Sequence, residues 1–347
     1  MIDYSQSKIL NLSAHIVGNG VNGGKLKLSE ETLEIDDDNI EQSLLSYFLS
    51  GFTTPEYRCF TSESNDFRVN PVFNFVSAIF STPQSFHENS INIAHHLYNT
   101  TLLPTIRPGE LFIAHLTGVR IENESVSAIG IFKAETKASY LKLNSSSATF
   151  KLKIDTGIDI QKLDKGCLIL NLEKDSGFKV IAIDALNKAE AQFWVNDFLC
   201  VTPRADNFHH TRNFMDMTRQ YVDGHMGDEF QVSKADKIDL LNRSMNFFKS
   251  KDQFDKREFE QEVLEDPSVI DSFRSYERTL SGQDRDIADN FEISAQAVRK
   301  QVRVFKSVLK LDKNFHIYIH GNRQLIERGF DEITNKHYYK IYFDQET

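Results

Sequence analysis

Hydrophobic and polar residues alternate with a period of two through much of the first half of the chain. This alternation predicts β-strands that bury one face. The predicted strands cover residues 9–17, 25–28, 111–121, 126–134, 139–143, 148–154, 167–173 and 178–183. Apolar residues at helical spacing predict helices over residues 39–50, 69–81 and 84–99. We therefore expect a mixed or antiparallel sheet with flanking helices.

From about residue 189 the apolar spacing changes from two residues to 3.6, the period of an α-helix. Helices are predicted over residues 189–197, 206–222, 234–250, 255–265, 268–280 and 294–310. Strands are predicted near residues 315–320, 325–330 and 337–343. These patterns predict an α+β chain with two domains, an α+β sheet domain (1–188) and a mainly helical domain (189–347) that ends in a β-hairpin.

The composition is that of a globular protein. Hydrophobic residues make up 40% of the 347 positions and charged residues 26%, while Gly (16) and Pro (7) are scarce enough to favour regular elements. No apolar run approaches the roughly 18 residues that a membrane span needs. The first four residues, MIDY, do not resemble a secretory signal. We therefore expect a cytoplasmic protein without a membrane partner.

Motifs for cofactors, metals and nucleophiles are missing. Residues 18–23 read G-x-G-x-x-G, but the strand-like residues 25–28 follow where a dinucleotide site needs a helix, so we expect a hairpin loop. The three cysteines, Cys59, Cys167 and Cys200, lack C-x-x-C spacing, and the histidines include no H-E-x-x-H. The sequence predicts no cofactor, no metal site and no catalytic residue.

One fragment keeps a nuclease open as an alternative. Glu135-Thr136-Lys137 ends a predicted strand, and Glu122 and Glu124 precede that strand. Two carboxylates and a lysine at a sheet edge could hold Mg²⁺ and stabilise phosphoryl charge. The E-x-K triplet is common by chance, so a solvated strand end is the competing interpretation.

The chain is acidic, with a net charge of −10, but its charges are segregated. Residues 29–41 carry seven acids and no bases, which would favour a helix N-terminus at residue 39. Residues 251–293 carry six bases and thirteen acids, whereas residues 295–313 carry six bases and one acid. A basic segment on an acidic protein predicts a local surface that faces phosphates.

The basic segment is periodic. On a predicted helix over residues 294–313, five bases recur at steps of four, three, four and three, and Lys300 adds a sixth. That spacing places them on one stripe of a helix, beside an apolar stripe one residue earlier. The candidate DNA-binding residues are Arg299, Lys300, Arg303, Lys306, Lys310 and Lys313.

Two other interpretations of this segment stay open. Residues 286–300 resemble a helix-turn-helix, with a short helix, a tight turn and a basic second helix, although the turn has no glycine. Alternatively, the basic stripe is solvated or pairs with the acidic segment before it.

The same residues resemble a known family. ISAQAVRKQVRVFKSVLKL (293–311) and FHIYIHG (315–321) resemble the C-terminal part of a bacterial nucleoid-associated protein family of roughly 37 kilodaltons. AIGIFK (128–133) and YLK (140–142) resemble its central sheet region. The resemblance implies a bacterial cytoplasmic protein found with the nucleoid, and it supplies no catalytic residues.

Our leading hypothesis is a non-enzymatic nucleoid-associated protein that contacts the phosphates of duplex DNA through the basic helix. In the alternative, the basic stripe binds an acidic surface on a DNA-processing protein, and association with DNA is indirect. A homodimer is compatible with the first hypothesis, because pairing would double the phosphate contacts.

Overall fold

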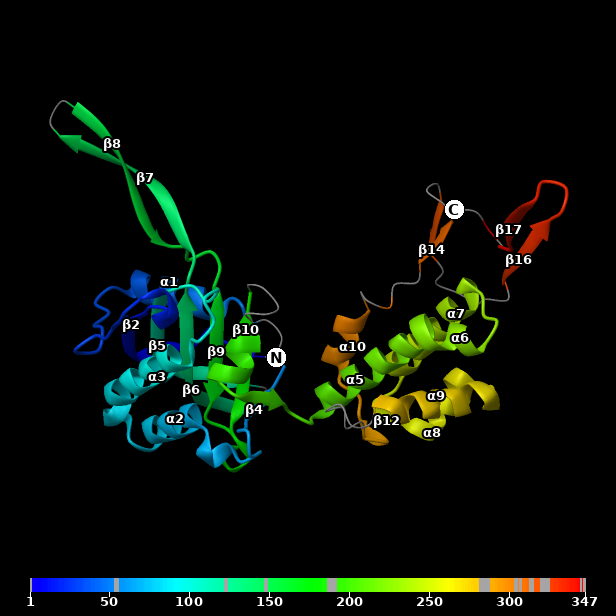
Figure 1. Cartoon of the computed structure of the whole chain (residues 1–347), viewed down its shortest axis with the longest axis horizontal. Coiled ribbons are helices and arrows are strands. Elements are labelled where there is room, and N and C mark those ends of the chain that lie inside the picture. The colour runs from blue at the N-terminus through cyan, green and yellow to red at the C-terminus, as the bar shows by residue number, and fades with distance from the viewer. Residues whose placement is uncertain are drawn as a thin grey trace. The chain divides into compact units, whose positions relative to one another are not determined.

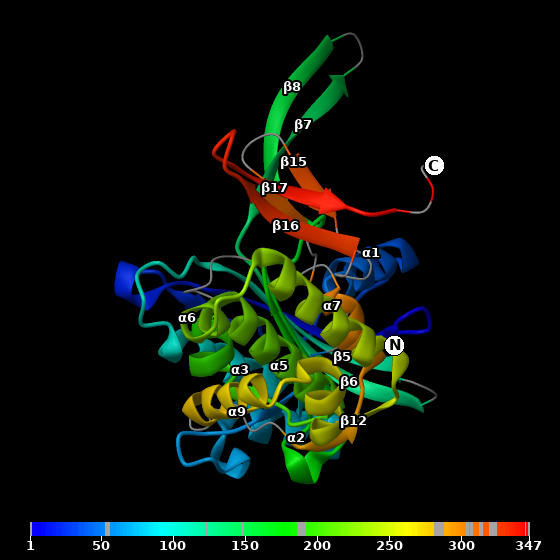
Figure 2. The same cartoon turned by 90° about the vertical axis from the view of Figure 1, so that its right-hand side faces the viewer.

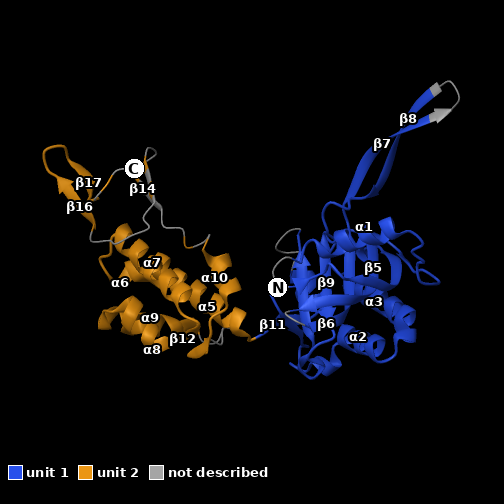
Figure 3. Cartoon of the chain, turned by 180° about the vertical axis from the view of Figure 1, so that it is seen from behind, with its two compact units in different colours: residues 1–204 blue, residues 205–347 orange. Residues whose placement is uncertain are grey.

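The structure of the chain, a computed structural model, divides into two compact units, Met1–Arg204 and Ala205–Thr347 (Figures 1 and 3). It describes all residues except 1, 53–55, 122–123, 147–148, 186–191, 281–287, 303–304, 306–307, 312–314, 319–324, 344 and 346–347. For residues 145, 146, 149, 308–310, 316 and 318 it describes the backbone alone. The division follows Arg204, whereas the change in apolar period predicts a boundary at residue 188.

In the described part of the chain, unit 1 is built on a nine-stranded antiparallel sheet. The strand order is β11-β4-β10-β9-β6-β5-β2-β3, and β1 pairs with β5. The strands are β1 (Ile2–Asp3), β2 (Lys8–Val17), β3 (Leu26–Lys27), β4 (Arg58–Phe60), β5 (Gly109–Ile121), β6 (Glu124–Ala134), β9 (Lys165–Leu170), β10 (Lys179–Asp184) and β11 (Val201–Pro203). The strands predicted over residues 111–121 and 126–134 are confirmed as β5 and β6, which pair with each other.

Helices cover both faces of this sheet. α2 (Pro71–Ser81) and α3 (Phe86–Thr100) pack on one face and α1 (Asp38–Leu49) on the other, which confirms the three helices predicted in this half. On β6, Ile131 belongs to the first core, whereas Phe132 stacks on Phe48 of α1 with ring centroids 4.2 Å apart. All six residues of β9 are buried, as expected for a central strand covered on both faces.

The glycine-rich loop joins β2 to β3. Val17 lies opposite Leu26, so the G-x-G-x-x-G sequence is the hairpin loop that the sequence predicts. The Asn19 side chain fixes the loop by donating hydrogen bonds to the carbonyls of Leu103 (2.9 Å) and Ile106 (2.8 Å). A side chain at Gly18 would meet the backbone at 2.6 Å, which explains the glycine there.

The acidic run before α1 caps that helix. Asp37 is the N-cap residue, and its carboxylate accepts a hydrogen bond from the Asn39 amide at 2.8 Å. Asp38 and Glu41 lie in the first turn, where the unsatisfied amides of the helix favour negative charge. The prediction made from residues 29–41 is confirmed.

Unit 2 is mainly helical, and the helices predicted over residues 206–222, 234–250 and 268–280 are confirmed. Its helices are α5 (Asn207–Gln220), α6 (Met226–Glu229), α7 (Lys234–Ser250), α8 (Lys256–Phe259), α9 (Pro267–Leu280) and α10 (Ala295–Gln301), with π-helical turns η6 (Tyr221–His225) and η7 (Glu260–Leu264). Its strands are β12 (Gln253–Asp255), β13 (Asn290–Glu292), β14 (Val308–Leu311), β15 (Phe315–Tyr318), β16 (Ile326–Asp331) and β17 (Lys336–Ile341).

Phenylalanines form the centre of unit 2. The ring of Phe214 on α5 lies 4.4 Å from that of Phe254 and 4.9 Å from that of Phe259. β12 pairs with β13, so that Phe254 and Phe291 are opposite each other and their rings stack at 4.5 Å. Much of the large phenylalanine content is therefore core.

The two C-terminal hairpins, β14–β15 and β16–β17, pack beside α7 (Figure 2). Leu311, Ile317, Ile326 and Tyr339 surround Ile238 of α7 in a small separate cluster. The predicted C-terminal strands are confirmed. Among the described helices, none combines the length and the apolar character that crossing a membrane requires.

Because each unit has its own apolar clusters, a core truncation in one should leave the other folded. Phe214→Ala should destabilise unit 2 by about 3–5 kcal/mol, through lost burial and the cavity left behind. Hydrogen exchange measured by mass spectrometry should show loss of protection in residues 205–347 and unchanged protection in residues 1–204. Equal losses in both units would contradict this expectation.

His15 should make unit 1 sensitive to acid. Burial, followed by the nearby His87 and His95, lowers the pKa of His15 from 6.5 to about 4. The folded state then binds fewer protons than the unfolded state between these values, so stability falls as the pH drops below about 6.5 and levels off near 4. Urea midpoints measured across this range should depend less on pH in His15→Gln. An unchanged pH dependence would exclude His15 as the cause.

Candidate nucleic-acid interface

α10 carries the first two of the predicted DNA-binding residues. The Ser294 hydroxyl caps the helix, and Ala297, Val298 and Gln301 form its buried face. Arg299 and Lys300, in the last turn, are exposed, and the Lys300 ammonium lies 5.4 Å from the centre of the Phe208 ring. Two cations thus project from the C-terminal end of a short helix.

The long basic helix predicted over residues 294–313 is wrong at residues 308–311, and α10 itself ends at Gln301. Residues 308–311 form strand β14, in which Lys310 pairs with His316 of β15. Leu309 belongs to the predicted apolar stripe of the helix, but Leu309 and Leu311 together also satisfy a period of two. Packing of Leu311 beside Ile238 favours the strand. Arg303, Lys306 and Lys313 lie outside the described residues.

The helix-turn-helix interpretation is also contradicted. Residues 290–292, where the motif requires a helix or a tight turn, form strand β13 and pair with β12. α10 then follows with seven residues, which is shorter than the second helix of the predicted motif.

Several acids of the segment before α10 pair with bases of the same segment. Lys251 binds Glu258 and Glu262 at 2.6 and 2.7 Å, and Lys256 binds Glu277 at 2.6 Å. The guanidinium of Arg274 holds the carboxylate of Glu260 through two hydrogen bonds. The negative charge of residues 251–293 is therefore partly compensated by bases of the same segment.

A pocket of about 360 Å³ lies within this acidic segment, and it is lined by charged side chains of both signs. Lys256 and Arg274, two of its bases, are held by the acids named above. The lining therefore does not favour an anion over a cation.

A two-stranded arm projects from unit 1 and forms a second basic surface (Figures 1 and 2). β7 (Lys137–Ser146) and β8 (Thr149–Ile158) pair with each other over ten positions in a sheet of their own. We call this hairpin the arm. The sequence predicts both strands but places them in the main sheet. The structure instead shows that they leave that sheet and pair only with each other.

The pairing register separates the arm into two unlike faces. Leu141 lies opposite Ile154 and Leu143 opposite Leu152, which makes one face apolar. Lys142 lies opposite Lys153 and Asn144 opposite Lys151, so the three lysines share the other face. We call these the apolar face and the lysine face, and both are exposed.

The lysine face concentrates positive charge. Lys142 and Lys153 are directly opposite, with β-carbons about 5 Å apart, and like charges in that position are destabilising. Asp155 compensates partly, because its carboxylate lies 3.2 Å from the Lys153 ammonium. Over residues 137–158 the arm carries four lysines and one acid. The sequence contains a signal for this surface, because Lys142, Lys151 and Lys153 alternate with apolar residues in the two strands.

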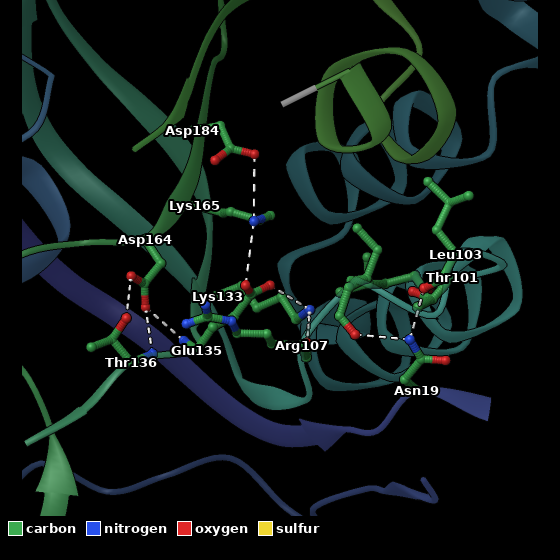
Figure 4. Close-up of polar contacts among 12 residues, drawn as sticks. Asn19, Thr101, Leu103, Arg107, Lys133, Glu135, Thr136, Asp164, Lys165 and Asp184 are labelled. Carbon is green, nitrogen blue, oxygen red and sulfur yellow. Dashed lines mark hydrogen bonds and ion pairs between the residues drawn. The ribbon is translucent and has the colours of Figure 1, made fainter. Parts of the chain in front are cut away.

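The root of the arm holds a buried network of charges (Figure 4). Glu135 follows β6, and its carboxylate binds the ammonium of Lys133 at 2.7 Å and that of Lys165 at 3.3 Å. Lys165 also lies 3.5 Å from Asp184. All four side chains are almost completely removed from solvent.

Asp164 joins the two chain segments at the root of the arm. Its carboxylate accepts hydrogen bonds at 2.7 Å from the amides of Glu135 and Thr136 and from the Thr136 hydroxyl. The segment that enters β7 is thereby tied to the segment that leads into β9 (Figure 4).

The structure does not assemble the residues of the nuclease alternative. Glu135 is buried and occupied by two ammonium groups, while Lys137 is exposed and pairs with Glu110. Glu124 begins β6, at the opposite end of that strand from Glu135, and Glu122 lies outside the described residues. Among the residues that are described, no three His, Cys, Asp or Glu side chains form a group that could hold a metal ion.

Glu135→Ala should destabilise unit 1 by about 3–5 kcal/mol, because it leaves two buried ammonium groups without their carboxylate. Adding Lys133→Met, Lys165→Met and Asp184→Leu should restore most of the free energy of unfolding, since apolar groups then fill the site and the Asp184 carboxylate, which also binds Lys165, is removed with it. Urea unfolding would measure both changes. A quadruple variant no more stable than Glu135→Ala would show that the buried charges are not responsible.

Comparison with known proteins gives one family. The model of the family NA37, described as nucleoid-associated protein YejK, matches residues 13–341. No curated protein matches the chain.

Proposed function

The chain belongs to the NA37 family of nucleoid-associated proteins, and on this premise we propose that it contacts duplex DNA directly in the bacterial cytoplasm, without catalysis. The match spans nearly the whole chain and agrees with the resemblance of residues 293–311 and 128–133. Membership gives the association with the nucleoid. The direct contact and the surfaces that make it are our proposal.

The observation that carries the proposal is the lysine face of the arm. Lys142, Lys151 and Lys153 project together from a protein whose net charge is −10, and two of them face each other across the ladder. A row of phosphates would relieve that repulsion, and release of the counterions from DNA would favour binding. The lysine face therefore has the charge and exposure that phosphate contact requires.

The dimensions of the arm suit a duplex. Ten residues of strand at about 3.3 Å each extend for about 33 Å, which is close to one turn of B-DNA. The major groove is about 12 Å wide and admits a two-stranded ribbon. Lysines act as point charges on phosphates, so we expect little dependence on base sequence.

We propose the end of α10 as a second contact. Arg299 and Lys300 are exposed there, and Arg303, Lys306, Lys310 and Lys313 continue the basic segment along the chain. Contacts on both units would make binding depend more steeply on salt than contacts on either unit alone.

Charge reversal on the arm should weaken DNA binding. We expect Lys142→Glu with Lys151→Glu to lower the affinity for a random duplex at least tenfold at low salt. The slope of log affinity against log salt should fall by about 2, because two phosphate contacts are lost. Fluorescence anisotropy at several salt concentrations measures both quantities, and Arg299→Glu with Lys300→Glu tests the second contact in the same way.

The matched control is Lys25→Glu with Lys27→Glu, which changes the charge of unit 1 equally at two exposed positions on and beside β3. The control should bind almost as well as the original chain. If it loses as much affinity as the arm variant, net charge and not the arm governs binding. If the original chain does not bind even at low salt, indirect association through a DNA-processing protein is favoured, and partners should persist in nuclease-treated lysate.

A further inference from the structure

The apolar face of the arm exposes large side chains that other proteins keep buried. Leu141, Leu143, Leu152 and Ile154 are 68%, 60%, 70% and 68% exposed, and Phe150, two residues before Leu152, is 73% exposed. The register places all five on one side, because residues two apart along a strand share a face. This is a continuous stripe and not a scatter of single surface residues.

The stripe is large for the surface of a monomer. Five side chains of this size, about two-thirds exposed, leave on the order of 600 Å² of apolar surface in water. A contiguous patch of several hundred Å² usually marks an interaction site. A two-stranded ribbon alone is also only marginally stable in water, so a ten-pair arm gains stability when one face is covered.

We propose that the apolar faces of two arms, from two copies of this chain, pack against each other. A two-fold axis brings the same surface of each copy together, so one self-complementary stripe supplies both halves of the interface. Two ribbons stacked face to face lie about 10 Å apart, as in paired sheets. Together the two stripes would bury on the order of 1,200 Å², which is the lower end of the range for specific interfaces.

The charges of the arm favour a second copy of this chain as the partner of the stripe. The five side chains of the stripe carry no charge, so they offer nothing to DNA or to an acidic protein surface. Lys142, Lys151 and Lys153 point to the opposite side, so packing apolar face on apolar face keeps the two lysine faces outside, away from each other. Lys137 shares the side of the stripe but lies at the root, where it pairs with Glu110. A second copy is therefore matched in both polarity and charge.

The stripe also has a firm base. Ile158 shares this face at the root of β8, and it packs against the unit 1 core cluster that includes Leu163 and Phe132. The network of Glu135 and Asp164 fixes the strands at the same root. The arm therefore presents its stripe in a defined direction relative to the sheet, as a two-fold interface requires.

Pairing of arms is independent of DNA binding, and it would give the pair two outward lysine faces. The test uses the full chain without DNA, so failure of the proposed DNA contact leaves the pairing intact. Light scattering after size exclusion should give about twice the chain mass of 39.9 kDa at micromolar concentration. Leu143→Glu with Leu152→Glu, an opposite pair at the centre of the stripe, should raise the dissociation constant of the dimer at least tenfold.

Two further variants keep the outcome decisive. Leu143→Ser with Leu152→Ser avoids new charge and should weaken the dimer in the same direction. The far-ultraviolet circular dichroism spectrum should be unchanged in both pairs, which would show that the units stay folded. Lys142→Ser with Lys151→Ser changes the opposite face and should leave the dimer intact. A monomeric original chain overturns the proposal. So does a dimer that survives both stripe variants, because another surface would then hold it together.

Discussion

The arm depends on the buried charges at its root. A hairpin that leaves a sheet needs its two ends held at the point of departure, because beyond it no neighbouring strand supplies hydrogen bonds. Here the carboxylate of Asp164 takes the first amides after β6, and Glu135 joins Lys133 on β6 to Lys165 on β9. Burial makes each of these contacts costly to break, because an ion that loses its partner stays out of water. The contacts at the root therefore stay formed, although the arm beyond them is surrounded by solvent.

The sequence predicts elements well where the evidence is local. The helices of unit 1 and the strands of its sheet follow from apolar spacing and from capping residues such as Asp37. Prediction from the sequence is wrong where a helical period and a period of two fit the same residues. In residues 302–311 the apolar positions suit a helix, and only packing beside α7 and pairing with β15 produce the strand β14. Such contacts join residues far apart in the chain, and no short window contains them.

The candidate site shows the same limit. Both strands of the arm are predicted, but alternation indicates a strand without indicating which neighbour it pairs with. Alternation places bases on one side of each strand, but only the pairing of Lys142 with Lys153 shows that the lysines of both strands share one face. Arg299 and Lys300, by contrast, follow from charge spacing alone, and α10 exposes both side chains. Their contact with DNA stays a prediction. Net charge was the least informative quantity, since pairing within residues 251–293 compensates part of the acidity beside α10.

The topology of unit 1 also sets an order for its synthesis. β4 lies at residues 58–60, yet both of its partners, β10 and β11, come more than 100 residues later in the chain. While the ribosome is still producing the central strands, β4 has no neighbour, and the sheet can be completed only after Pro203 has emerged. Pairing between such distant segments is slow and leaves strand edges open in the meantime. A nascent chain of this protein would therefore be most prone to aggregation just before the first unit is finished, when the arm has already been made.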